Sequence, residues 1–357
     1  MNAGKVDLPV VPEDLVMSLL AKLNLQQRIG QRFLSWIPGT TAGKKAREII
    51  LENYVAGVVI SAQNVSDKVQ VKELTAALQK ISLEATPPIS IFIGVDQEGG
   101  RIARFRFKQT VVFPAAFYMA EHNDESFVES AAYITGRELL DMGCNMNFAP
   151  VLDVYGKPDD TIIGDRSMGW KSERVGDMGK AYLAGSARAG LISVIKHFPG
   201  HGITTVDSHT ELPLVDGGRD VAFDRHLLPF RMAIAGGAEV LMTAHILYTD
   251  IDRENPVPLS PAIIQGILRN ELGFDGVVIS DAVDTRSLTR KFSASEIVRR
   301  SFKAGVDLLL CTDVFSVTDL KAEVLKLLAS GQLTEDDIAR GTLRVLRLKL
   351  RYGLASL

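Results

Sequence analysis

The 357-residue chain has only two cysteines, Cys144 and Cys311, which lie far apart in the sequence. Two isolated thiols exclude a disulfide framework, so we expect two buried thiols in a reducing compartment. Every long apolar stretch is interrupted by a charge, and the N-terminus lacks a basic region followed by an apolar core. These absences exclude a membrane span and a secretory signal, so we expect a soluble, cytoplasmic protein with no membrane partner.

The chain also has no large excess of positive or negative charge. The 40 Lys and Arg residues are matched by 43 Asp and Glu residues, which gives a formal net charge of −3 at pH 7. This balance gives no reason to expect nucleic acid as a partner. The chain has no internal repeat, no low-complexity tract and no Pro- or Ser-rich linker. We therefore expect residues 1–357 to form a single domain with a large core.

Short runs rich in Val and Ile recur between longer segments of helical periodicity. Such alternation is typical of a parallel α/β fold. Helices are expected, for example, over residues 125–142, ending at Gly143, and over residues 319–329, which have one apolar face. The expected strands are 55–60, 89–96, 146–154, 192–198, 211–215, 239–246, 275–281 and 306–312, of which the fifth has the weakest pattern.

Eight strands alternating with helices predict a (β/α)8 barrel of the TIM type. A doubly wound open sheet is the alternative, but no Gly-rich phosphate turn follows the first expected strand. In a barrel, the loops that follow the strands build the functional site. The residues at the strand ends therefore indicate what the protein does.

Polar residues gather at these strand ends. One charged residue after a strand is ordinary loop capping, whereas charge after so many strands indicates a site. The residues are Asp96, Glu98 and Arg101 after the second strand, Asp153 in the third, Asp165 and Arg166 in the loop beyond it, Lys196 and His197 in the fourth, His245 in the sixth and Asp281 in the seventh.

The segment KHFPGHGITTVDSHTELP, residues 196–213, holds three of the six histidines. Its prolines and glycines prevent a helix, so His197 and His201 cannot form a paired metal-binding face. Asp207 and His209 lie two residues apart, where a carboxylate can bond one ring nitrogen and favour the imidazolium. This pair is a usable acid near neutral pH, although the spacing alone is a weak signal. We expect neither a metal nor a cofactor.

Five motifs occur in an order that resembles glycoside hydrolase family 3, and within it the bacterial β-N-acetylhexosaminidase branch that recycles peptidoglycan. The motifs are DQEGGRIARF (96–105), NFAPVLDV (147–154), IGDRSMG (163–169), KHFPGHG with DSH (196–209) and GFDGVVISD (273–281). The resemblance implies one barrel that removes terminal N-acetylglucosamine, with retention of configuration, from a muropeptide or related glycan. The family's β-glucosidase-like branches take a glutamate acid from a second domain, whereas the Asp-x-His loop favours the hexosaminidase branch.

The resemblance assigns roles to individual residues. Asp281 corresponds to the catalytic nucleophile, His209 to the acid/base and Asp207 to the residue that orients His209. A retaining mechanism needs a carboxylate that attacks the anomeric carbon and leaves again. An imidazolium can protonate the leaving oxygen, and the resulting imidazole can deprotonate water. Sugar binding is assigned to Asp96, Arg104, Arg166, Lys196 and His197.

Other polar residues are expected to have supporting roles. Glu98 and Arg101 should form an ion pair that holds the Gly99–Gly100 turn. His201 should shape its loop and His245 should line the pocket floor, and neither should donate a proton. The stretch Ala282-Val283-Asp284-Thr285 departs from the family pattern after the nucleophile, which bears on local packing but removes no catalytic atom.

Two other functions fit parts of the pattern. A metal-dependent barrel hydrolase could use His197, His201, His209 and Asp281, but no expected strand carries two alternating histidines. A non-catalytic sugar-binding barrel would retain the cationic and acidic clamp. The chain also retains groups for nucleophilic attack and proton transfer, so we favour hydrolysis of a small carbohydrate substrate.

Overall fold

The computed structural model describes residues 9–155, 162–204, 206, 208, 211–216, 221–312 and 314–356. Eight parallel strands form one sheet in the spatial order β11-β9-β7-β6-β3-β2-β1-β12. Their bounds are β1 Phe33–Trp36, β2 Gly57–Ile60, β3 Phe92–Val95, β6 Met146–Asn147, β7 Ile192–Phe198, β9 Val240–Thr243, β11 Val277–Ser280 and β12 Leu309–Cys311.

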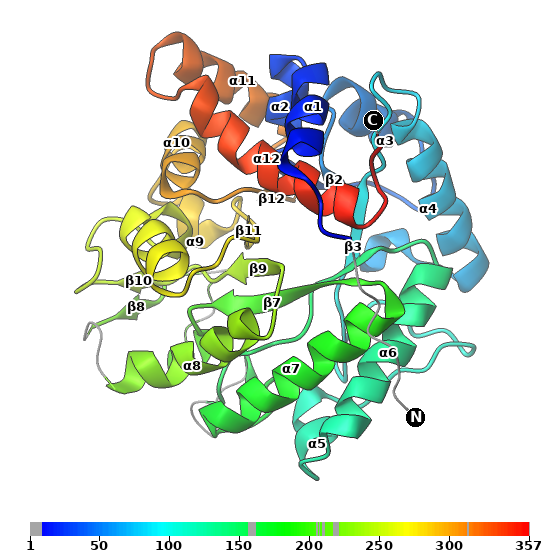
Figure 1. Cartoon of the computed structure of the whole chain (residues 1–357), viewed down its shortest axis with the longest axis vertical. Helices are drawn as coiled ribbons and strands as arrows, with labels where there is room; N and C mark the ends of the chain where they lie inside the picture. The colour runs from blue at the N-terminus through cyan, green and yellow to red at the C-terminus, as the bar shows by residue number, and fades with distance from the viewer. Residues whose placement is uncertain are drawn as a thin grey trace.

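The two outer strands, β11 and β12, meet and close the sheet. Ile279 and Leu308 form a parallel bridge, and the Ser280 amide donates to the Leu308 carbonyl at 2.9 Å. The Ser280 hydroxyl oxygen also accepts from the amide of Leu310 at 3.1 Å. The expected (β/α)8 barrel is therefore confirmed (Figure 1).

One expected barrel strand is wrong. Residues 211–215 contribute only the short β8 (Leu214–Val215), which pairs with β10 (Leu247–Tyr248) in a separate two-stranded sheet. Pro213 has no amide proton, and Leu214 is 57% exposed, so this run lacks the buried ladder of a barrel strand. The missing barrel strand is β1, whose sequence FLSW is short and contains no Val or Ile, so Val/Ile enrichment does not reveal it.

Helices surround the sheet in Figure 1, with α6, α7 and α8 along one side. The expected helix over 125–142 is α6, and Gly143 follows its last turn with a φ of +77°, which favours glycine. The expected helix over 319–329 lies within α11. The α-helices are α1 Glu13–Lys22, α2 Leu25–Gly30, α3 Lys44–Arg47, α4 Lys68–Ser82, α5 Ala116–Ala120, α6 Glu125–Asp141, α7 Ser172–Ala189, α8 Val221–Ala235, α9 Arg286–Thr289, α10 Ala294–Ala304, α11 Val317–Ala329 and α12 Glu335–Arg351.

Six 3-10 or π-helical segments and one hairpin complete the fold of the described residues. The hairpin joins β4 (Gln97–Gly99) to β5 (Ile102–Ala103) directly after β3. The helical segments are η1 Glu48–Glu52, η2 Ala62–Asn64, η3 Gly164–Arg166, η4 His201–Ile203, η5 Val257–Leu259 and η6 Ala262–Glu271. The hairpin and η3 matter most here, because both bring charged residues to the carboxyl ends of the strands.

The barrel interior and the space under the helices are filled by alternate residues of each strand. In β2, Val59 belongs to the interior cluster with Phe92 and Phe148, whereas Val58 and Ile60 belong to the cluster under the helices. This alternation follows from the two-residue period of a strand. The interior is therefore packed with apolar side chains, and a substrate has to bind above it.

The amino-terminal end of the barrel is closed by α12. Val345 and Leu348 of this helix belong to the interior cluster, and Lys349 is fully buried with its Nζ 5.1 Å from the centre of the Phe92 ring. Burial lowers the pKa of Lys349 well below its usual value. The Nζ atom has no hydrogen-bond partner among the described residues. Apolar packing thus closes this end of the barrel, and it buries the amine of Lys349.

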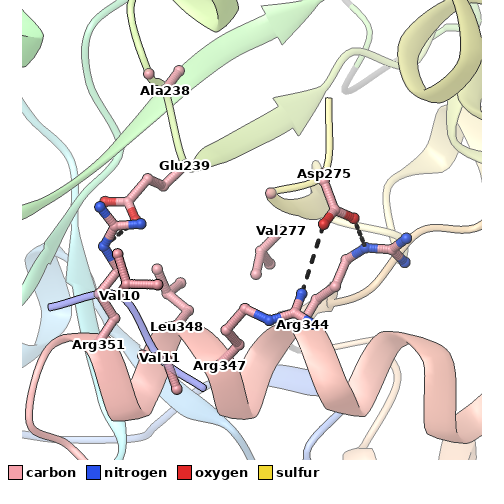
Figure 2. A pocket seen from close by; sticks show the side chains of 12 residues that line it. Val10, Val11, Ala238, Glu239, Asp275, Val277, Arg344, Arg347, Leu348 and Arg351 are labelled. Atoms are coloured by element: carbon pink, nitrogen blue, oxygen red, sulfur yellow. Dashed lines mark hydrogen bonds and ion pairs between the residues drawn. The ribbon is translucent and has the colours of Figure 1, made fainter. Parts of the chain in front are cut away.

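A cavity of about 340 Å³ lies at the same end, between α12 and the starts of β9 and β11. Figure 2 shows that its charged residues face one another in pairs. Arg351 Nε lies 3.0 Å from Glu239 Oε1, and Arg344 Nε lies 3.2 Å from Asp275 Oδ1. Arg347 Nη1 approaches the other Asp275 oxygen at 3.7 Å. We interpret these pairs as a clamp that fastens α12 to the barrel, on the side opposite the strand carboxyl ends.

Cys144 and Cys311 are both free and buried, as expected. Burial raises the pKa of Cys144 to about 12 and also raises that of Cys311, so both thiols are protonated at neutral pH. Within the described ranges, no helix is long and apolar enough to span a bilayer.

Candidate active site

A cavity of about 360 Å³ opens at the carboxyl ends of the strands. The six described residues to which the sequence assigned nucleophilic or sugar-binding roles all line it: Asp96, Arg104, Arg166, Lys196, His197 and Asp281. Asp207 and His209 lie outside the described residues. Apolar walls complete the cavity, including Trp36, Phe148, Met242 and Leu310.

Each charged residue reaches the cavity from the end of a strand or from the connection that follows it. Asp96 directly follows β3, Asp281 directly follows β11, and Lys196 and His197 lie in the last three residues of β7. Arg104 follows the β4–β5 hairpin, and Arg166 ends η3. This is the face on which the loops of a parallel barrel build a site.

Lys196 lies at the centre of a charge network. Its Nζ is 2.9 Å from Asp96 Oδ1 and 2.6 Å from Glu98 Oε1, and its side chain is only 3% exposed. Burial alone would lower the pKa of Lys196, but the two carboxylates outweigh burial and raise it. Lys196 therefore stays charged, with its ammonium position fixed by two acids.

Besides its pair with Lys196, Glu98 forms an ion pair with Arg166, and not with Arg101 as expected. Arg166 donates to it through two parallel bonds, from Nε and Nη2, both 2.8 Å long. Burial alone would raise the pKa of Glu98, but Lys196 and Arg166 outweigh burial and hold the pKa well below its usual value, so the carboxyl stays ionised. Arg101 instead pairs with Asp165 at 3.1 Å. The expected Glu98–Arg101 pair is wrong, because loops distant in sequence supply better-placed partners to both residues.

Asp153 is a site residue whose role the sequence reasoning missed. It is fully buried, and its Oδ2 lies 2.6 Å from Nδ1 of His197. Its carboxylate also accepts from the His197 amide at 3.2 Å and from the His201 amide at 2.6 Å. Burial raises the pKa of Asp153, but His197 and these hydrogen bonds outweigh it and lower the pKa below its usual value. A charged residue near the end of an apolar run, NFAPVLDV, was the available signal.

The orientation of His197 follows from Asp153. Because Nδ1 faces an ionised carboxylate, this nitrogen carries a proton and Nε2 is left for a ligand. His201 is held beside it, with its backbone on Asp153 and its Nε2 3.0 Å from the hydroxyl of Ser208. Burial lowers the pKa of His201. These contacts agree with the expected role of His201 in shaping the loop.

Asp281 is held close to the backbone at the end of β11. Its amide donates to the Thr243 carbonyl at 3.3 Å, and its Oδ1 accepts from the Ala282 amide at 2.7 Å. The preceding residues, VVIS, are all buried. A rigid strand thus presents this carboxylate to the cavity.

The unusual residues after Asp281 are well packed. Val283 is fully buried, and its amide bonds the Leu310 carbonyl at 2.9 Å. The Asp284 carboxylate accepts from the amides of Thr312, Val314 and Phe315 and so holds the loop after β12. The departure from the family pattern therefore leaves the loop well packed, and two of its residues, Ala282 and Thr285, line the cavity.

The lining of the cavity fits an uncharged polar ligand. Among its described residues, three acids (Asp96, Glu98, Asp281) balance three permanent cations (Arg104, Arg166, Lys196). The expectation that His245 lines the pocket floor is wrong, because its side chain is not part of the cavity lining and its Nε2 lies 2.8 Å from the Ala282 carbonyl. Within the described ranges, no group of three or more His, Cys, Asp or Glu residues is arranged to hold a metal ion.

A closed parallel barrel with such a charged cavity at the strand carboxyl ends is the architecture of a TIM-barrel enzyme. The sequence profile described as the glycosyl hydrolase family 3 N terminal domain matches residues 24–348. The chain therefore belongs to glycosyl hydrolase family 3, as its motifs indicated.

Two curated relatives have related names. Beta-hexosaminidase A of Pseudoalteromonas piscicida is 32% identical over 339 residues, which cover 89% of this chain and 57% of the relative. Beta-hexosaminidase of Nitrosomonas eutropha is 33% identical over 291 residues, which cover 80% of this chain and 81% of the relative. This chain thus spans little more than half of the first relative and most of the second.

Solved structures show the same barrel. A glycoside hydrolase family 3 beta-N-acetylglucosaminidase from Paenibacillus sp. str. FPU-7 superposes with a TM-score of 0.89 at 36% identity, covering 94% of this chain and 64% of that one. Beta-N-acetylhexosaminidase from Beutenbergia cavernae gives a TM-score of 0.85 at 29% identity, covering 92% and 99% of the two chains.

Proposed function

We propose that the protein is a retaining exo-β-N-acetylglucosaminidase. It removes terminal N-acetylglucosamine through a covalent intermediate on Asp281, with His209 as acid/base and Asp207 as the residue that orients His209. The observation that carries the proposal is the position of Asp281: it closes β11 and lines the cavity that contains the Lys196 network. The names of the relatives, beta-hexosaminidase and beta-N-acetylglucosaminidase, support the choice of sugar.

In the first step, an Asp281 carboxylate oxygen attacks the anomeric carbon while the glycosidic bond breaks. His209 transfers its proton to the departing oxygen, so the aglycone leaves as an alcohol. In the second step, neutral His209 removes a proton from water, the water oxygen attacks the anomeric carbon, and the bond to Asp281 breaks. Two displacements at one carbon give retention of configuration.

The remaining polar residues would hold the sugar in place. Lys196 and Arg104 can donate to hydroxyl or N-acetyl oxygens, and Asp96 can accept from hydroxyls. The Nε2 atom of His197 faces away from the Asp153 carboxylate and is available for the same purpose. Arg166 is held by Glu98 through Nε and Nη2, and its Nη1 donates to the Ile162 carbonyl at 3.4 Å, so its guanidinium is fixed at the cavity.

For the natural substrate, we propose a muropeptide in which N-acetylglucosamine is linked to anhydro-N-acetylmuramic acid, or a related glycan. We also propose that the reaction takes place in the cytoplasm. The two free, buried thiols support a reducing compartment.

The proposed roles are tested by comparing wild type, Asp281→Ala and His209→Ala on two substrates. One is 4-nitrophenyl N-acetyl-β-glucosaminide, whose leaving group needs little protonation, and the other is a natural disaccharide. Asp281→Ala should lose nearly all turnover on both. His209→Ala should lose much more on the disaccharide, because that leaving group depends on the proton.

The matched control is Asp275→Asn, which removes a carboxylate two residues before the same strand, at its opposite end. Its kcat/KM should match wild type on both substrates. Equal losses of His209→Ala on the two substrates would contradict the proton-donor role. Full activity of Asp281→Ala would contradict the nucleophile.

A further inference from the structure

Four aromatic side chains form a cluster that is open to solvent: Phe117 and Tyr118 of α5, together with Tyr155 and Trp170. The centre of the Trp170 ring lies 4.9 Å from that of Tyr155 and 5.2 Å from that of Phe117, and Phe117 lies 5.7 Å from Tyr118. Trp170 is 53% exposed and Tyr118 is 56% exposed. Single exposed aromatics are common, but a cluster drawn from three separate segments marks a binding surface.

Chain connectivity limits how far the cluster can lie from the residues of the sugar cavity. Tyr155 is two residues beyond Asp153, whose carboxylate contacts His197, so its Cα is within about 7 Å of Asp153 Cα. Trp170 is four residues beyond Arg166 and therefore within about 14 Å of it. Helix α5 packs against η3, which ends at Arg166. The segments that carry the rings thus follow, or pack against, the segments that bring Asp153 and Arg166 to the carboxyl side of the barrel.

The backbone under these rings is held firmly. The Tyr155 amide donates to the Gly169 carbonyl at 2.9 Å, which ties together the two segments that carry Tyr155 and Trp170. Arg225 donates to the Trp170 carbonyl at 2.8 Å. A surface ordered before binding loses less entropy when a ligand arrives.

From this arrangement we infer that the cluster is a subsite for the aglycone, on which the sugar ring next to the scissile bond packs by its apolar face. The inference rests on the proposed function, because exo cleavage leaves only the terminal sugar in the cavity and directs the remainder outward. The ring faces are apolar and uncharged, and they match the C–H face of a pyranose. The subsite would distinguish substrates with a sugar aglycone from those without one.

The test compares two substrates that share the terminal sugar. N-acetyl-β-glucosaminyl fluoride has no ring in its leaving group, whereas the chitin trisaccharide places N-acetylglucosamine rings beyond the scissile bond. In Trp170→Ala, kcat/KM for the fluoride should stay within about twofold of wild type, while kcat/KM for the trisaccharide should fall about 10-fold. Trp170→Phe should recover most of the loss, because it restores an aromatic face.

Two further variants keep the test decisive. Tyr118→Ala, which removes the most exposed ring of the cluster, should show the same selective loss even if Trp170→Ala folds poorly. Phe127→Ala is the matched control, since Phe127 is 44% exposed and its ring contacts Phe113. It should leave both substrates unchanged.

Equal losses on the fluoride and the trisaccharide, or no loss on the trisaccharide, would overturn the subsite. If the trisaccharide shows no loss, the aromatic cluster would bind a protein partner and not a sugar. A wild-type protein that hydrolyses neither substrate would instead overturn the proposed function, so the two failures are distinguishable.

Discussion

The Oδ2 atom of Asp153 lies 2.6 Å from Nδ1 of His197, inside the barrel wall and out of contact with solvent. The same carboxylate accepts from the amide of His201. One buried acid thus orients a ring that faces the cavity and fixes the start of the loop that follows it. This relationship makes Asp153 a positioning residue for the site.

Asp153→Asn should lower kcat/KM by about 10- to 100-fold, because small misplacements of site residues can cost about 100-fold in rate. Steady-state kinetics on 4-nitrophenyl N-acetyl-β-glucosaminide, corrected for the folded fraction, measures the effect. The matched control is Asp307→Asn, another buried acid, which bonds Arg269 at 2.7 Å and the Val278 amide. The control should lose stability but keep its turnover. Similar kinetic losses in both variants would show that Asp153 acts only through stability.

Glu98→Gln should destabilise the fold by about 3–5 kcal/mol, since it leaves the buried Lys196 and Arg166 without their shared counter-charge. Denaturant unfolding measures this free energy. Glu84→Gln is the matched control, because it removes the exposed ion pair with Arg47. Exposed pairs contribute little, so its unfolding midpoint should stay close to wild type. Equal stabilities of the two variants would contradict the central place of Glu98 in the network.

His226 should make stability depend on pH below neutrality. Burial, with a smaller contribution from Arg225, lowers the pKa of His226 to about 4. The unfolded chain binds this proton near pH 6.5, so the contribution of His226 is complete above about 6.5 and is lost as pH falls toward 4. Melting temperatures of wild type and His226→Gln should therefore converge as pH falls from 7 to 4. A constant difference over that range would contradict the lowered pKa.

Lys349→Met should stabilise the protein by about 1–3 kcal/mol, because it replaces a buried amine by an apolar side chain of similar shape. The amine lies over the Phe92 ring at the closed end of the barrel, far from the strand carboxyl ends. Activity at 25 °C should therefore be unchanged while the unfolding midpoint rises. A lower midpoint would show that the amine has a stabilising role.

The sequence predicted site residues best at positions where a charged residue stands at the end of an apolar strand. Asp96, Lys196 and Asp281 were found in this way, because parallel strands all end at one face of the barrel. Strand β1 was missed because its four residues, FLSW, have too little β-branched character to stand out. The run ELPLV predicts a barrel strand from its hydrophobicity, but hydrophobicity does not show which strand the run pairs with, and it pairs with β10 outside the barrel.

The sequence also does not show which charged residues contact one another in the site. Glu98 and Arg101 are near in sequence and opposite in charge, but Glu98 pairs with Arg166, 68 positions along the chain. Such pairs depend on how loops from different strands approach one another, which sequence spacing does not encode. The role of Asp153 was hidden for the same reason, since its partners lie 44 and 48 positions away.

The most direct test of the account is to trap the intermediate. Incubation with 5-fluoro-N-acetyl-β-glucosaminyl fluoride should slow turnover and leave one sugar covalently bound, and peptide mass spectrometry should place it on Asp281. An active enzyme that forms no adduct, or an adduct on another residue, would contradict the proposed mechanism.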